Sequence, residues 1–155
     1  SPAEVAEARA RLSQREFSLF LHEAPRDRRH SMDLFHLLRR ERGPDGQPAS
    51  DDLLAAALLH DVGKGRLRDW HRVLYVLLNA ASPGFARRLE SSEGPGWQQA
   101  LWRLRYHARI GAELLAAEGS SPRVVEVVRQ HTASPRAMES TDAEIAWFIR
   151  ADDRV

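Results

Sequence analysis

The chain has 155 residues, of which 23 are Lys or Arg and 22 are Asp or Glu, so its formal net charge at pH 7 is +1. Such a balance gives no strong field to attract nucleic acid or anionic lipid, and we expect neither as a partner. Cysteine is absent, which excludes disulfides and thiolate metal sites. Any bound metal must therefore be held by His, Asp or Glu.

The composition is that of a single globular domain. A hydrophobic share of 43% and a charged share of 29% are typical of soluble globular proteins. No signal peptide and no apolar run long enough to span a bilayer are found, so we expect a cytoplasmic protein with no membrane partner. The first residue is Ser rather than Met, which leaves open that the sequence belongs to a larger protein. The oligomeric state is open as well.

Caps, turn residues and apolar periodicity predict helices along the whole chain and no strand. Two capping-box patterns, beginning at Ser1 and Ser13, each start a helix. Turn-forming residues from 43 to 48 separate a long helix from the apolar helix that follows it. In chain order, the predicted helices start at Ser1 and Ser13, run from Pro25 to about Arg42 and from Ser50 or Asp51 to a C-cap at Gly63, and then cover 70–79, 85–89, 97–117, 122–131 and 141–152. We expect the tryptophans to be core anchors, with stacking in a ligand pocket as the alternative for Trp70.

An adjacent His and Asp close the most informative segment of the chain. Residues 53–59 are all Leu or Ala, and a helix that is apolar on every side is usually buried. His60 and Asp61 follow directly. A buried carboxylate needs a cation or several hydrogen bonds, because burying it without a partner is costly. Since imidazole and carboxylate both bind divalent transition metals, the segment predicts a metal site at the inner end of a buried helix.

Lys64 follows three residues later and is the only lysine of the chain. Arginine supplies every other basic side chain, although either residue serves as surface charge. An ammonium group is a compact charge that suits contact with a phosphate, so we interpret Lys64 as a phosphate ligand, with chance as the alternative.

Further ligand-type side chains occur in a similar setting. His131 and Asp152 each end an apolar helix, as His60 does. His30 lies in the first turns of the long third helix, and His107 lies one turn before Gly111, which permits close backbone packing. A single such histidine is more often a core or surface residue than a ligand. The recurrence of the pattern is harder to explain by packing alone.

The ordered set of these residues resembles the HD superfamily of metal-dependent phosphohydrolases. The local sequences Ala-Leu-Leu-His-Asp-Val-Gly-Lys around His60 and His-Ala-Arg-Ile-Gly-Ala-Glu-Leu-Leu from His107 match the family, and the resemblance extends from about Arg29 to Asp152. It implies an all-α, single-domain helical bundle of the HD type. We expect an N-terminal helical segment, residues 1–24, to pack on the core and residues 25–155 to form the HD domain.

The resemblance also implies a site for one or two divalent transition-metal ions. Fe, Mn, Ni or Co are expected, whereas Mg suits an imidazole-rich site less well. The family pattern assigns a first ion to His30, His60, Asp61 and Asp152, and a second to His107 and His131 with Asp61 as the bridge. Asp153 is the alternative to Asp152. Such a centre activates a water for attack on phosphorus.

The implied function is hydrolysis of a phosphomonoester or phosphoanhydride of a small molecule, with a nucleotide as the favoured class. Asp61 and Lys64 are the expected catalytic residues. Lys64 and Arg109 are the expected substrate contacts, although Arg109 can equally be a solvated surface residue. His131 is followed by Thr-Ala-Ser, and the His-His-Glu and Gly-Tyr-Pro signatures of members that cleave cyclic dinucleotides are missing. The alternative is a catalytically weak regulatory or nucleotide-binding module, within a larger signalling protein, whose cleft would be occluded.

Overall fold

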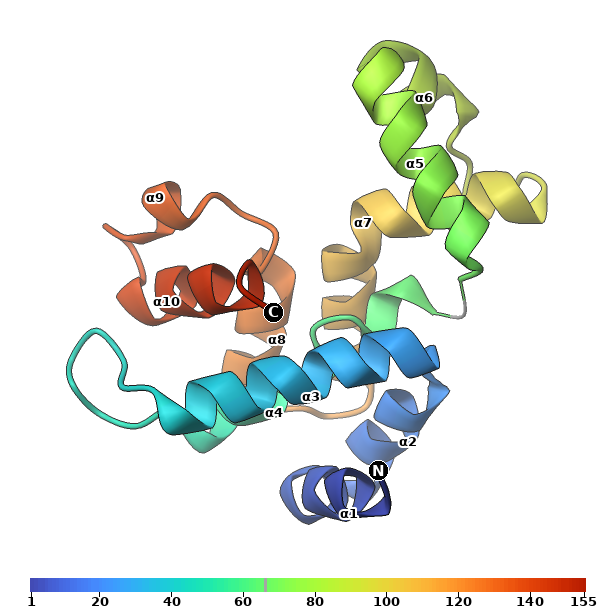
Figure 1. Cartoon of the computed structure of the whole chain (residues 1–155). Coiled ribbons are helices and arrows are strands. Elements are labelled where there is room, and N and C mark those ends of the chain that lie inside the picture. The colour runs from blue at the N-terminus through green and yellow to red at the C-terminus, as the bar shows by residue number, and fades with distance from the viewer. Residues whose placement is uncertain (66) are drawn as a thin grey trace.

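The computed structural model describes residues 1–65 and 67–155, and every regular element in that part of the chain is a helix (Figure 1). The predicted all-α fold is therefore confirmed. The elements are α1 (Pro2–Arg11), α2 (Gln14–His22), α3 (Pro25–Arg40), α4 (Asp51–Leu59), the 3₁₀ helix η1 (Val62–Lys64), α5 (Asp69–Ala81), α6 (Pro83–Leu89), α7 (Gly96–Ala117), α8 (Pro122–Gln130), α9 (Pro135–Met138) and α10 (Ala143–Asp152).

Side-chain caps start several helices where the sequence predicts them. Ser1 and Ser13 each accept a hydrogen bond from the backbone N–H three residues later, and both capping boxes are complete. Ser50 rather than Asp51 caps α4, because its hydroxyl accepts a hydrogen bond from the backbone N–H of Leu53. These caps satisfy backbone donors that the first turn of a helix leaves free.

Some helix boundaries differ from the prediction, and one short helix was not predicted. Helix α3 ends at Arg40 instead of about Arg42, because Glu41 already has an extended backbone. Helix α6 begins two residues earlier than expected, since Ser82 caps it and Pro83 occupies its first position. The four-residue helix α9 is absent from the prediction, and it is too short to give a periodic signal.

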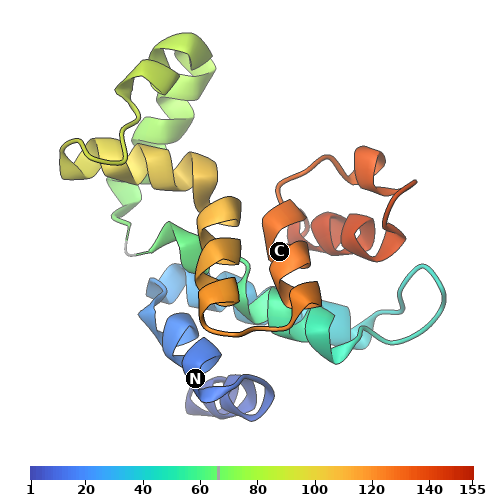
Figure 2. The same cartoon turned by 180° about the vertical axis from the view of Figure 1, so that it is seen from behind.

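Helix α4 lies inside the molecule, and α1, α2, α3 and α8 all contact it (Figures 1 and 2). All seven residues from Leu53 to Leu59 are buried, together with Phe35 and Phe148. Fully burying a side chain of this size stabilises the fold by about 1.5–3 kcal/mol. The core therefore holds the end of α4, where His60 and Asp61 follow, in a fixed place.

Two glycines set the position of the His-Asp turn against α7. The prediction that Gly63 is the C-cap of the preceding helix is wrong, because His60 caps α4 and Gly63 lies in η1. A Cβ at Gly63 would lie 2.0 Å from the carbonyl oxygen of His107 and 2.6 Å from the amide nitrogen of Gly111. Only glycine permits this approach of η1 to α7.

Helices α5 and α6 form an arm that projects from the body together with the first half of α7, which bends part-way along its length (Figures 1 and 2). Helix α5 packs against α6 and α7 through one side. Trp70 lies on this arm and is exposed, against the expectation of a core anchor, whereas Trp147 is buried and Trp97 and Trp102 are half-buried. No helix of the described residues has both the length and the apolar character needed to cross a membrane.

We expect Gly63→Ala to lower the free energy of unfolding by about 1–3 kcal/mol, because the added methyl group must push η1 away from α7. Urea denaturation followed by circular dichroism measures this change. Gly84→Ala is the matched control, since a Cβ there meets no atom within 4 Å. Equal stability of the two variants would contradict the close contact between η1 and α7.

Candidate metal centre

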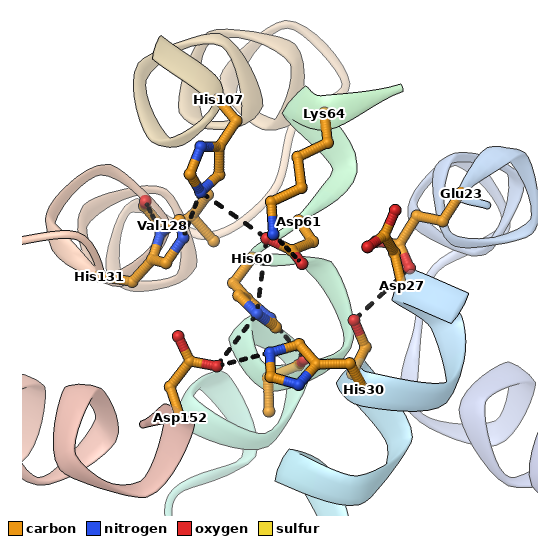
Figure 3. A network of polar contacts seen from close by, with 12 residues as sticks. Glu23, Asp27, His30, His60, Asp61, Lys64, His107, Val128, His131 and Asp152 are labelled. Carbon is orange, nitrogen blue, oxygen red and sulfur yellow. Dashed lines mark hydrogen bonds and ion pairs between the residues drawn. The ribbon is translucent and has the colours of Figure 1, made fainter. Parts of the chain in front are cut away.

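The six side chains of the expected ligand set converge at one place in the structure (Figure 3). His60 and His131 are the C-caps of α4 and α8, and Asp152 is the last residue of α10. His30 projects from α3 and His107 from α7. Asp152, rather than its exposed neighbour at position 153, is the carboxylate that reaches His30.

Three helices thus end at the same point. The carbonyl end of a helix carries a partial negative charge, because its last C=O groups have no partner within the helix. The C-terminal ends of α4, α8 and α10 therefore add to the negative potential of the two carboxylates. The combined field favours a cation at this position.

His30, His60 and Asp152 form one side of the cluster. The Nε2 of His30 donates a hydrogen bond to Oδ1 of Asp152 at 2.8 Å. The Nε2 of His60 lies 3.3 Å from the same oxygen. One carboxylate oxygen thus faces two imidazole nitrogens, and the three ligand atoms lie within 4.8 Å of one another.

Three of the four imidazoles are oriented by the same backbone contact. In each ring Nδ1 lies at hydrogen-bond distance from the carbonyl three residues earlier, and since a carbonyl only accepts, Nδ1 is the donor. The neutral ring then has its lone pair on Nε2, which faces the centre of the cluster. The pairs are His60 with Ala57 at 3.0 Å, His107 with Leu104 at 2.8 Å and His131 with Val128 at 2.7 Å.

The inner atoms of the cluster lack suitable partners. The Nε2 atoms of His107 and His131 are 3.1 Å apart, and two lone pairs at that distance repel each other. Neighbouring ligands of one ion, each about 2.1 Å from it, would be separated by roughly 3 Å. Among the described residues, Nε2 of His60 and Oδ1 of Asp61 are buried without a hydrogen-bond partner. The donor set therefore fits a divalent metal.

The positions of the ligand atoms indicate which residue could be shared between two metal ions. His60, Asp61 and His131 form a second set whose ligand atoms lie within 4.8 Å of one another, so His60 belongs to both sets. The resemblance to the HD superfamily implied that Asp61 holds the shared position. A histidine oriented through Nδ1 has one free nitrogen and binds one ion, whereas a carboxylate can serve two. In this arrangement Oδ2 of Asp61 lies 2.5 Å from Nζ of Lys64, and Oδ1 faces the imidazoles.

The electrostatic environment gives the buried histidines very different pKa values. Burial alone would lower the pKa of His60, but the carboxylates of Asp61 and Asp152 raise it to about 9. Burial, together with the neighbouring imidazoles of His60 and His107, lowers the pKa of His131 to about 3. Burial opposes ionisation of Asp61 and Asp152, yet the facing cationic groups hold both carboxyl pKa values well below normal. Without metal, a proton on His60 and the ammonium group of Lys64 together offset the charges of the two carboxylates.

A polar cavity of about 490 Å³ adjoins the cluster and reaches His30, Asp61 and Lys64. Lys64 is therefore placed between a candidate ligand and the space where a substrate would lie. Arg109 is elsewhere: its side chain is 55% exposed, its guanidinium lies over the ring of Tyr106, and it does not line the cavity. The structure thus brings together every expected site residue except Arg109.

Two buried carboxyl groups beside the cluster were missed by the sequence analysis (Figure 3). Glu23 follows the last turn of α2, and burial raises the pKa of its carboxyl group well above normal. Asp27, in the first turn of α3, accepts a hydrogen bond from Arg72 of α5 at 2.5 Å. Neither residue stands in a motif, so only the packing of α2 and α3 beside η1 reveals them.

Comparison with known families agrees with this geometry. A family model described as HD domain matches residues 28–153, about four-fifths of the chain. The chain belongs to the HD domain family. The resemblance inferred from the sequence is confirmed, and the family places this HD domain protein in a superfamily of metal-dependent phosphohydrolases that bind divalent metals. Searches of curated proteins and of solved structures returned no match.

We expect metal binding at pH 7.5 to release about one proton, because His60 is protonated without metal and must lose that proton to act as a ligand. Affinity should rise as the pH increases toward 9, where His60 loses the proton by itself. Calorimetric titration of manganese in two buffers with different ionisation enthalpies measures the release. Equal apparent heats in both buffers would contradict a protonated His60.

Proposed function

We propose that this HD domain protein hydrolyses the phosphomonoester or phosphoanhydride bond of a small molecule, with one or two transition-metal ions held by the six-residue cluster. The observation that supports this most directly is the meeting of four imidazoles and two carboxylates, with unsatisfied ligand atoms, beside a polar cavity. Fe, Mn, Ni or Co suit such a donor set better than Mg, which prefers oxygen ligands.

A metal ion bound there would polarise a phosphoryl oxygen and make a water molecule more acidic. In the hydrolysis, the water oxygen bonds to phosphorus, the bond to the leaving oxygen breaks, and that oxygen takes up a proton. We assign to Lys64 the task of stabilising charge on the phosphoryl oxygens, since its ammonium group borders the cavity. The Nδ1 contacts of the histidines keep their rings aimed at the centre.

The open cavity favours an enzyme over a regulatory module whose cleft would be filled. Nucleotides are the first class to examine, because the resemblance to the HD superfamily favours them as the substrate class. A panel of phosphate esters with added manganese, iron or nickel, and with chelator as the negative control, tests the proposal. Tight nucleotide binding without turnover by the metal-loaded protein would favour the regulatory module instead.

We expect the purified protein to contain one or two transition-metal ions per chain. Asp61→Ala should lose both, because its carboxylate would serve both positions, whereas His107→Ala should empty mainly the second. Elemental analysis of the purified variants measures the content. His36→Ala is the control, since His36 pairs with Glu7 outside the cluster. Full occupancy in Asp61→Ala would exclude the bridging role.

Lys64→Ala should lower turnover by roughly ten- to a thousandfold while metal content is retained, because one charge-stabilising contact is lost. Arg109→Ala is the matched control and should leave turnover nearly unchanged, since Arg109 lies outside the cavity. Steady-state phosphate release and elemental analysis of the same samples separate the two effects. Unchanged turnover in Lys64→Ala would make the single lysine an accident of composition.

A further inference from the structure

An apolar groove on the arm adjoins the polar cavity beside the metal centre, because the two share lining residues. The groove has a volume of about 330 Å³ and is lined by Arg26, Arg72, Val73, Val76 and Leu77. Arg26 and Arg72 also line the polar cavity. The two arginines therefore form a cationic collar between the space beside the candidate ligands and an aliphatic surface on α5.

The aliphatic side chains of the groove are unusually open to solvent. Val73, Val76 and Leu77 are 58%, 63% and 61% exposed, because α5 packs against α6 and α7 through its other side. Contiguous apolar patches of this kind commonly mark a binding site. Arg72 is fixed in place, since the buried carboxylate of Asp27 accepts its hydrogen bond at 2.5 Å.

Because the same two arginines line both the polar cavity and the apolar groove, we infer that the substrate is a phosphate ester whose remaining part is an apolar, alkyl-like group. The inference rests on the proposed function. The phosphate lies at the metal centre, the collar faces the anionic end, and the apolar group lies along α5. Among the described lining residues of the groove, only the guanidinium groups of Arg26 and Arg72 could pair with the edge of a nucleobase, and Arg72 is already paired with Asp27. The groove thus favours an alkyl group over a nucleoside.

A second copy of the chain fits the groove less well. Two lining residues of the groove are arginines, and an apolar dimer contact over them would bury their charge. An anionic small molecule beside the shared arginines would instead pair with that charge.

The test uses manganese-loaded full chain and the series methyl, butyl and octyl phosphate, each below its critical micelle concentration. The leaving alcohols have similar basicity, so differences in kcat/KM report binding of the alkyl group. We expect kcat/KM to rise with chain length by up to roughly threefold for each methylene that the groove buries. Turnover of methyl phosphate reports the proposed function, and the dependence on length reports this inference.

Val76→Asp should abolish the rise of kcat/KM with chain length, measured within each variant as the ratio of kcat/KM for octyl phosphate to that for methyl phosphate. Leu114→Asp is the matched control, because Leu114 is 41% exposed on α7 and lines neither cavity. Hydrolysis of all three esters at equal kcat/KM would overturn the inference and leave the proposed function intact. A higher kcat/KM for a nucleoside monophosphate than for octyl phosphate would also overturn the inference. So would a wild-type protein that is a dimer and that Val76→Asp converts to a monomer. Absence of turnover with every ester would remove the proposed function and this inference with it.

Discussion

Two imidazole nitrogens, on His107 and His131, face each other 3.1 Å apart inside the protein, and the rest of the site is arranged around that contact. Each ring donates its other nitrogen to a backbone carbonyl, so neither can turn away without leaving a buried carbonyl unsatisfied. The unpartnered oxygen of Asp61 points at the same place. Such an arrangement is unfavourable by itself and becomes favourable when a cation occupies the centre.

The fold supplies the stability that this arrangement requires. Helix α4 has no polar residue between Leu53 and Leu59, and all of those side chains are buried. The helix therefore cannot slide or rotate without exposing apolar surface, and its end is a rigid support for His60 and Asp61. The glycine contact between η1 and α7 fixes His107 relative to that end. The positions of the candidate metal ligands therefore depend on packing contacts made by other residues.

The arm formed by α5 and α6 is packed less tightly than the core around α4. Its apolar side chains are exposed, and its link to the body at the cavity is the ion pair between Arg72 and Asp27. An element held in this way can vary without disturbing the core. The exposed apolar surface of the arm agrees with the proposal that the arm contacts the apolar part of the substrate.

The sequence by itself determined the helical class, most helix starts and the ordered set of donors, because capping residues, apolar periodicity and ligand types are local properties. A boundary between residues 1–24 and 25–155 and a cytoplasmic location stay predictions. Tertiary structure alone decided that Gly63 is a contact rather than a cap, that Trp70 is exposed and that Arg109 lies outside the cavity. It alone revealed Glu23 and Asp27 beside the centre. Each of these features depends on which helices pack against one another. The sequence pattern along one helix shows which face is apolar, but it does not show which helix covers that face.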